Sequence, residues 1–221
     1  SFGAAPDEVI TRAVQQEIDA GLFPGAVVVV GRPGQVIYEG AFGHAQIEPD
    51  RVEMQTDHLF DLASVTKVVA TGTAFGICVD EGWLRFDMPI AEALPALSGS
   101  GIDRITTLQL ATHTSGFNNV KYHGRAKGEA MLELMLGATP AWEPGTRYYY
   151  SCLNMILLGR MVERASGQPL DEFCQARIFR PLGMRDTAFG PLAASSRVVP
   201  TSAPEIGQIE DEQARFAGRP V

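Results

Sequence analysis

The sequence predicts an α+β fold, in which an N-terminal helix and a β-hairpin of a central antiparallel sheet precede a lobe of helices. Three observations lead to this prediction. Two runs rich in β-branched residues flank a Pro-Gly turn near the N-terminus, helical patterns follow from Asp61 to Phe179, and no strong strand pattern comes after them. Because the helices are grouped and do not alternate with strands, the pattern is typical of α+β proteins.

The first predicted element is a helix that opens at Pro6-Asp7-Glu8 and ends near Gly21. Proline is favoured at the first helical position, acidic side chains suit the N-terminal end of the helix dipole, and glycine commonly ends a helix. The buried face is predicted to consist of apolar residues about one turn apart, namely Val9, Ile10, Val14 and Ile18.

A β-hairpin is predicted next, with strands at 26–31 and 35–40 around the turn Arg32-Pro33-Gly34. The first run, AVVVVG, is apolar on both faces, which is typical of a strand buried inside a larger sheet. Two strands alone make a marginal sheet. We therefore expect the sheet to be incomplete in this chain.

Helices are predicted after the hairpin, near residues 64–81, 89–94, 107–112, 128–136, 153–165 and 170–179. From Phe189 onward the chain loses periodicity. We therefore expect three parts: residues 1–60 as the N-terminal part of an α/β lobe, residues 61–190 as a helical lobe, and residues 191–221 as an irregular tail that leads to a missing C-terminal segment.

Composition excludes several classes of partner. The net charge of −8 argues against nucleic-acid and anionic-membrane partners, and no apolar run reaches the length of a membrane span. The three cysteines and four histidines show no metal-ligand spacing. We therefore expect no nucleic acid, no membrane span and no metal.

The most apolar helical segment contains a single charged residue. Between Val65 and Val79 that residue is Lys67, and Ser64 precedes it by three positions. On a helix this spacing places both side chains on one face. Desolvation lowers the pKa of an amine, so that a buried lysine can share or accept a proton near neutral pH, and a serine needs such a neighbour to become a nucleophile. We interpret Ser64 as a candidate nucleophile and Lys67 as its proton partner.

Two other interpretations compete with this one. The spacing can arise by chance, and a lysine stem can pack against apolar neighbours while its amine reaches water. Among the other serines, Ser115 lies two residues from His113 in the segment THTSG, which we interpret as a helix end with turn chemistry and not as a catalytic site. No GxSxG motif is present.

Three consecutive tyrosines, at positions 148–150, precede the helix predicted near Leu153. Taken alone, they are typical of packing aromatics whose hydroxyl groups are satisfied at the rim of a core. A tyrosine acts as a base only when a nearby cation favours its deprotonated form. Lys67 is such a cation if the fold brings the side chains together.

Five segments, in matching order, resemble the serine β-lactamase-related superfamily. They are SVTK at 64–67, LATHTSGF at 110–117, PGTRYYYS at 144–151, LLG at 157–159 and IFRPLGMRDTAF at 178–189. The resemblance is strongest to the class C β-lactamase-like group, with its family VIII esterases and D-aminopeptidases. SxxK alone is a weak signal, but the ordered set of segments is specific.

The resemblance implies a β-lactamase/transpeptidase-like fold, with an α/β lobe packed on an all-helical lobe and the active site between them. It implies Ser64 as the acylated nucleophile and Lys67 as its proton partner. The register after PGTR selects Tyr150, rather than Tyr148 or Tyr149, as the counterpart of the family's catalytic tyrosine. It implies no cofactor, and a small ester or amide as substrate.

One departure from the family pattern concerns substrate binding. The family usually has Tyr-Ser/Ala-Asn at this motif, whereas Cys152 here follows Tyr150 and Ser151. A thiol is a weaker hydrogen-bonding group than an amide. Cys152 and the nearby Asn154 are the candidate substrate-binding residues, and the change favours ester or small-amide substrates over β-lactams.

A second departure concerns the later part of the sequence. The resemblance implies a Lys-Thr-Gly or His-x-Gly motif on a late strand that also supplies an oxyanion-hole N–H. The chain has no lysine after Lys127 and no histidine after His123. We therefore expect a C-terminal segment or a complementary fragment to complete the sheet, and we expect these residues alone to be weak or inactive as an enzyme.

The sequence thus predicts a serine hydrolase that cleaves an ester or amide through an acyl-serine, with esterase or peptidase activity favoured over efficient β-lactamase activity. Two alternatives stay open. An acyltransferase would use the same residues, and a non-catalytic member of the fold would bind peptide or cell-wall fragments. Cys152 and the absent late motif favour the binding protein slightly, whereas Ser64, Lys67 and Tyr150 favour catalysis.

Overall fold

The structure, a computed structural model, describes residues 6–118, 139–190 and 196–200. The chain divides into two compact units, one of residues 1–61 and 191–203, and the other of residues 62–190 and 204–221. The finer division at residues 60 and 190 into two lobes and a tail stays a prediction. Among the described residues, none of the helices combines the length and the hydropathy that a bilayer crossing requires.

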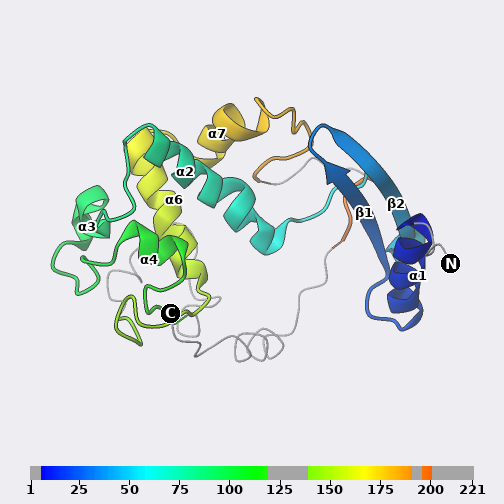
Figure 1. Cartoon of the computed structure of the whole chain (residues 1–221), viewed down its shortest axis with the longest axis horizontal. Helices are drawn as coiled ribbons and strands as arrows, with labels where there is room; N and C mark the ends of the chain where they lie inside the picture. The colour runs from blue at the N-terminus through cyan, green and yellow to red at the C-terminus, as the bar shows by residue number, and fades with distance from the viewer. Residues whose placement is uncertain (1–5, 119–138, 191–195, 201–221) are drawn as a thin grey trace. The chain divides into compact units, whose positions relative to one another are not determined.

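The first unit contains a helix and a small antiparallel sheet (Figure 1). Its elements are α1 (Pro6–Asp19), β1 (Gly25–Arg32), β2 (Gln35–Gln46) and β3 (Val52–Glu53), and the strand order is β1-β2-β3. The helix α1 packs against β2. The predicted helix and hairpin are confirmed, but Val9, which is predicted on the buried face of the helix, is 54% exposed. The sequence pattern does not predict β3, because so short a strand shows no periodicity.

The hairpin reverses at Pro33-Gly34, and Arg32 pairs with Gln35 across the turn. Gly34 has a φ of +78°, a conformation that residues with a Cβ rarely adopt. Proline followed by a glycine with positive φ is the signature of a type II turn. These two residues therefore determine where the chain reverses.

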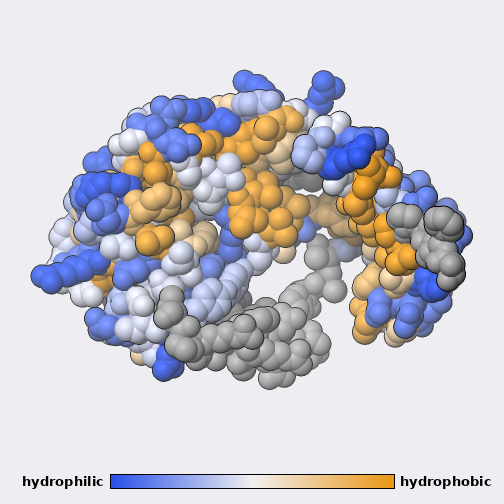
Figure 2. Space-filling view, viewed as in Figure 1, coloured by the Kyte–Doolittle hydropathy of each residue, from blue (hydrophilic) through white to orange (hydrophobic). Residues whose placement is uncertain are grey.

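The outer strand β1 is less buried than its sequence predicts. Its apolar run suggests burial on both faces, but Val29 is 56% exposed, and apolar residues are visible along the hairpin surface in Figure 2. Within the described residues the sheet ends at β1 and is not closed. The larger sheet that would bury β1 on both faces stays a prediction, whereas the expectation of an incomplete sheet is confirmed.

Leu59 connects the first unit's main segment to residues 197–199. Its N–H donates to the Arg197 carbonyl oxygen at 2.7 Å, and its own carbonyl oxygen accepts from the Val199 N–H at 2.9 Å. The two strands run parallel at this single bridge. No local pattern predicts it, because the partners lie far apart in the sequence.

The second unit is built from helices over most of its described residues. Its first helical stretch consists of the 3₁₀ helix η1 (Ala63–Val65), the π-helix η2 (Lys67–Gly72) and α2 (Thr73–Asp80). The other elements are α3 (Ile90–Ala93), η3 (Pro95–Leu97), α4 (Thr107–Ala111), α6 (Cys152–Ser166), α7 (Leu170–Cys174) and η5 (Gln175–Phe179). The helix predicted at 128–136 lies outside the described residues, and the other predicted helices are confirmed.

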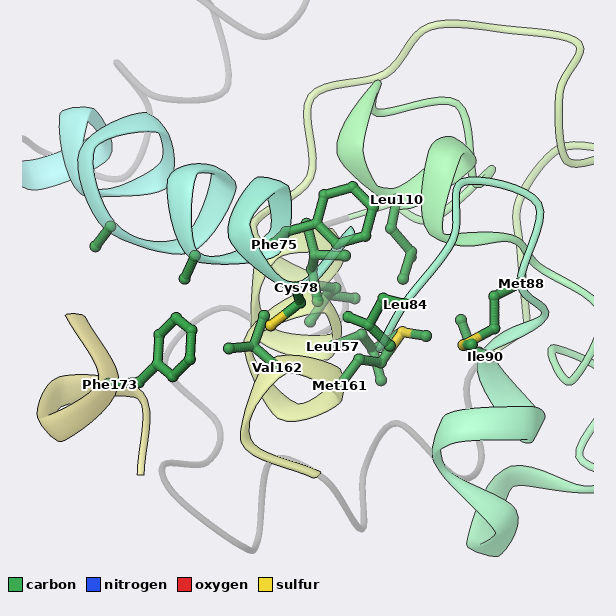
Figure 3. Packing of buried hydrophobic residues seen from close by; sticks show 14 of the residues in the cluster. Phe75, Cys78, Leu84, Met88, Ile90, Leu110, Leu157, Met161, Val162 and Phe173 are labelled. Carbon is green, nitrogen blue, oxygen red and sulfur yellow. The ribbon is translucent and has the colours of Figure 1, made fainter. Parts of the chain in front are cut away.

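Helix α6 is the centre of the second unit. It packs against η2, α2, α3, α4 and α7, and its apolar side chains occupy the middle of the core shown in Figure 3. Leu157, Met161 and Val162 of α6 are fully buried there. Because η2 and α2 lie against the same helix, this core determines where the start of α6 stands relative to η1 and η2.

Exposed apolar side chains surround the start of the first helical stretch. Leu62, Val65 and Val68 are 39%, 51% and 67% exposed, respectively, and Figure 2 shows an apolar patch over this part of the second unit. Exposed patches of this kind mark surfaces that bind ligands or other protein segments. Ser64 lies within this stretch.

The core makes a direct prediction about stability. Leu157→Ala should lower the free energy of unfolding by about 2–5 kcal/mol, because it removes a fully buried side chain and leaves a cavity. Ile156→Ala is the matched control, since Ile156 is the residue next to Leu157 and its side chain is 37% exposed. This substitution should lower the free energy of unfolding by less than about 1 kcal/mol. Urea denaturation followed by circular dichroism measures both. Equal losses in the two variants would contradict the core described above.

Candidate active site

Ser64 lies at the beginning of the helical stretch, where the backbone has an unusual conformation. Ala63, directly before it, has a φ of +43°, which is uncommon for a residue with a Cβ. Lys67 begins the π-helix η2, and such wide turns occur often at functional sites. Ser64 is exposed and Lys67 is half-buried. The local backbone thus presents the serine hydroxyl at the surface.

Three side chains from two parts of the chain meet at this hydroxyl. The Lys67 Nζ donates to Ser64 Oγ at 3.0 Å, and the Tyr150 hydroxyl donates to the same oxygen at 2.7 Å. The Lys67 Nζ also lies 5.0 Å from the centre of the Tyr150 ring. The structure therefore brings together the three residues selected from the sequence. Their catalytic role stays a prediction.

The other two tyrosines of the triplet have different partners. Tyr148 makes an edge contact with His113, with ring centroids 6.1 Å apart. Tyr149 lies tilted against Trp142, with ring centroids 4.9 Å apart. Of the three consecutive tyrosines, Tyr150 is thus the one whose hydroxyl reaches Ser64.

Backbone contacts hold the segment before α6 against the segment after α4. The Tyr149 N–H donates to the His113 carbonyl oxygen at 2.9 Å, and the Gly145 N–H donates to the Thr114 carbonyl oxygen at 2.7 Å. Gly116 has a φ of +83°, and a Cβ at this position would collide with the Trp142 carbonyl oxygen. The two segments can therefore approach closely only with glycine at position 116.

A buried polar network lies next to Tyr150. The Ser151 N–H donates to the His113 Nδ1 at 3.2 Å, and the Asn154 Nδ2 lies 3.0 Å from the same nitrogen. The Asn154 Oδ1 accepts from the Ser115 hydroxyl at 2.5 Å. The His113 ring itself lies 4.7 Å from the Tyr150 ring, centroid to centroid. The network thus contacts both the phenol ring and the backbone that follows it.

The environment of His113 favours the neutral imidazole. Burial, together with the positive charge of Lys67, lowers the pKa of His113 from 6.5 to about 4, and a contact with the Ser151 backbone opposes part of this shift. Because the Ser151 N–H donates to Nδ1, that nitrogen carries no proton, and the neutral ring is protonated at Nε2.

The two residues predicted to bind substrate occupy different environments. Asn154 is completely buried, and Ser115 and His113 use its amide inside the protein. The role of Asn154 in substrate binding stays a prediction. Cys152 is half-buried and lines a groove of about 420 Å³ that Lys67 also lines. Its role in substrate binding stays a prediction.

Sequence reasoning missed the part that His113 and Ser115 play in this site. The segment THTSG was expected to provide turn chemistry, and His113 does adopt a left-handed φ of +57° after α4. However, Ser115 is only 1% exposed and bonds to Asn154, a residue 39 positions away. A signal was available, because a histidine and a serine stand between the apolar residues Leu110 and Phe117.

Two further kinds of site, a metal site and a reactive thiol away from the groove, find little support among the described residues. Across the described ranges, no group of three or more His, Cys, Asp or Glu side chains could hold a metal ion. Burial raises the pKa of the Cys78 and Cys174 thiols to about 11 each. Thiols of this kind are poor nucleophiles near neutral pH.

The sequence is similar to those of known proteins. A family model described as Beta-lactamase matches residues 10–215. The chain is 32% identical over 227 residues to an Escherichia coli (strain K12) protein named "Putative D-alanyl-D-alanine carboxypeptidase", and the match covers 93% of this chain and 52% of the relative. It is 27% identical over 230 residues to the "N-acetylmuramyl-L-alanine amidase" of Bacillus subtilis (strain 168), covering 94% and 52%. The chain spans about half the length of the curated relatives it matches.

Solved structures have a similar fold. A class C beta-lactamase in complex with cefoxitin is 26% identical, with a TM-score of 0.72, and the match covers 81% of this chain and 50% of that one. A D-alanine carboxypeptidase from Burkholderia cenocepacia is 27% identical, with a TM-score of 0.69 and coverage of 81% and 49%. The predicted fold class is thereby confirmed.

The lowered pKa of His113 predicts a pH dependence of stability. Between pH 6.5 and 4 the unfolded chain binds a proton at this ring that the folded chain does not, so stability falls as the pH falls. His113→Asn removes this contribution. Its unfolding free energy should therefore depend less on pH in that window, by up to about 1.4 kcal/mol per pH unit. Urea denaturation at several pH values measures the slopes, and parallel curves for the variant and the wild type would contradict the prediction.

Proposed function

The chain belongs to the beta-lactamase family, and from this premise we propose that it is a serine hydrolase that cleaves an ester or amide through an acyl-Ser64 intermediate. The observation that supports this chemistry most directly is the pair of hydrogen bonds at Ser64 Oγ, from the Lys67 amine at 3.0 Å and from the Tyr150 hydroxyl at 2.7 Å. Each contact is a route along which the serine proton can leave once that partner is deprotonated.

In the proposed acylation step, Ser64 Oγ attacks the carbonyl carbon of the substrate. The serine proton passes to whichever of Lys67 and Tyr150 is deprotonated, and a tetrahedral oxyanion forms. Backbone N–H groups stabilise this oxyanion, and we assign one of them to Ser64 itself. The proton then moves to the leaving alcohol or amine, the bond to the leaving group breaks, and the acyl group remains on Ser64.

In the proposed deacylation step, water takes the place of the leaving group. Tyr150, in its deprotonated form, accepts a proton from the water, and the resulting hydroxide attacks the acyl carbon. The bond between that carbon and Ser64 Oγ breaks, the proton returns to Ser64, and the carboxylic acid is released. The cycle restores the starting protonation states and uses no cofactor.

The substrate class that we propose is an amide or an ester, with a peptide-like amide favoured. The names of the two curated relatives, a carboxypeptidase and an amidase, describe action on amide bonds. Cys152 lines the groove beside Lys67, and a thiol offers weaker hydrogen bonds than an amide. This favours peptidase or esterase activity over efficient hydrolysis of β-lactams.

We also propose that a further strand completes the sheet. Within the described residues β1 has β2 on one side and forms the edge of the sheet on the other, and Val29 of β1 is 56% exposed. An edge strand of this kind pairs readily with another segment. The proposed source is a C-terminal segment or a complementary fragment that carries the late motif and a second oxyanion donor. Without that donor, turnover should be slower by about 10²–10³.

Covalent labelling tests the proposed nucleophile. A fluorophosphonate probe should attach one phosphonyl group to Ser64, and peptide mapping by mass spectrometry locates it. We expect this reaction even where turnover is slow, because Ser64, Lys67 and Tyr150 all belong to the second unit. Ser64→Ala should abolish labelling, whereas Lys67→Ala and Tyr150→Phe should each lower its rate by about 10²–10⁴.

Ser98→Ala is the matched control, because Ser98 is an exposed serine of the same unit, and this variant should be labelled at the wild-type rate. A label on a different residue would refute the assignment of Ser64. A chain that forms no covalent product, and that binds a peptide equally well before and after Ser64→Ala, would be a non-catalytic binding protein.

A further inference from the structure

We infer that His113 is a positioning residue for Tyr150, because its ring lies against the phenol ring and its Nδ1 holds the backbone directly after that residue. The inference rests on the proposed function, in which Tyr150 carries the serine proton. In this role His113 touches neither substrate nor reacting atoms, and it acts through the orientation of Tyr150 alone.

The first contact is between the two rings. Their centroids lie 4.7 Å apart and their planes are inclined by 38°. This separation is typical of an attractive contact between aromatic rings. By contrast, Tyr148 contacts the same imidazole only edge-on, with ring centroids 6.1 Å apart. The imidazole thus restricts the plane in which the Tyr150 ring can lie.

The second contact is with the backbone. Ser151, the residue after Tyr150, donates its N–H to the His113 Nδ1 at 3.2 Å. Ser151 is also the residue that precedes α6, and it is fully buried. The start of α6 and the Cα of Tyr150 are therefore held at a set distance from the imidazole.

The orientation of the imidazole is in turn set by a chain of hydrogen bonds with one polarity. The Phe117 N–H donates to Ser115 Oγ at 3.3 Å, and the Ser115 hydroxyl donates to Asn154 Oδ1 at 2.5 Å. The amide nitrogen of Asn154 must then face His113, where it lies 3.0 Å from Nδ1. Both groups that reach Nδ1 are donors, so this nitrogen can only accept.

The charges around the ring agree with that arrangement. The groups that face His113 are Lys67 from η2, Tyr148 and Tyr150 from the segment before α6, and the neutral Asn154 amide from α6. A proton on Nδ1 would break both hydrogen bonds and place a second positive charge near Lys67. A neutral imidazole holds the Tyr150 ring in place, and Lys67 remains the positive charge that stabilises the Tyr150 phenolate.

These contacts also argue against His113 as the base for Ser64. Its Nδ1 is engaged by two donors inside the protein, and its Nε2 carries the proton of the neutral ring. The hydroxyl of Ser64 has Lys67 and Tyr150 as its partners instead. His113 therefore influences the reaction indirectly, through the position of Tyr150.

Two substitutions separate the parts of this role. His113→Ala removes both the ring and the acceptor. His113→Asn places a carbonyl oxygen close to the position of Nδ1, and asparagine tolerates the φ of +57° at this position better than most residues. The asparagine variant thus restores the backbone contact but not the ring contact.

The test is the rate at which a fluorophosphonate labels Ser64, measured by mass spectrometry in the wild-type and Tyr150→Phe backgrounds. With Tyr150 present, His113→Ala should slow labelling by about 10- to 100-fold, because small misplacements of a reacting group cost this much. His113→Asn should recover a substantial part of that loss. In the Tyr150→Phe background, all three versions of position 113 should react within about twofold of one another.

Leu97→Ala is the control for general destabilisation, because Leu97 is a buried residue of η3 and lies outside α6, η2 and α2. It should leave the labelling rate within about twofold in both backgrounds. If His113→Ala does not fold, Ser115→Ala tests the same chain of contacts, and it should slow labelling only when Tyr150 is present.

The outcomes distinguish the two levels of proposal. A wild-type chain that takes no label at Ser64 would overturn the proposed function, and the role of His113 in it would fall as well. A wild type that is labelled at Ser64, combined with an equal rate for His113→Ala, would overturn the inference alone. Equal slowing by His113→Ala in both backgrounds would also overturn it, because the effect would then not pass through Tyr150.

Discussion

The hydrogen bonds from Lys67 and Tyr150 to one oxygen, Ser64 Oγ, connect segments that lie 86 residues apart in the sequence. Lys67 reaches the serine through local helical geometry. Tyr150 reaches it only because α6 packs against η2 and α2 around a common apolar core. The geometry of the candidate site is therefore a consequence of the core of the second unit. Any change that shifts α6 relative to η2 should separate the phenol from the serine.

Contacts of the candidate site between residues close in the sequence could be predicted, whereas contacts between distant residues could not. Ser64 and Lys67 are three residues apart, so the helical repeat alone places them together. Tyr150 could be chosen from its triplet only through the register of the family motif. The contact between His113 and Asn154 joins residues 41 positions apart. A local reading assigns the first of them to a turn, because only the folded chain buries these polar groups together.

The fold follows the same rule. The turn Pro33-Gly34 and the periodic helices are encoded within short windows, and over the described residues the structure has them where the sequence predicts them. The bridge between Leu59 and Val198 depends on two distant segments, and β3 is too short to leave a pattern. The apolar run of β1 has the pattern of a fully buried strand, because apolar residues on both faces suit a strand inside a larger sheet. In the described residues that sheet stops at β1.

A crystal structure of the chain after reaction with a fluorophosphonate would show whether Ser64 is the nucleophile and whether Lys67 and Tyr150 stay beside it. We expect continuous density from Ser64 Oγ to phosphorus, with the Lys67 Nζ and the Tyr150 hydroxyl both within hydrogen-bonding distance of Ser64 Oγ or of a phosphonyl oxygen. Phosphorus on another side chain, or a Tyr150 hydroxyl turned away from Ser64 with Lys67 in bulk solvent, would contradict this expectation.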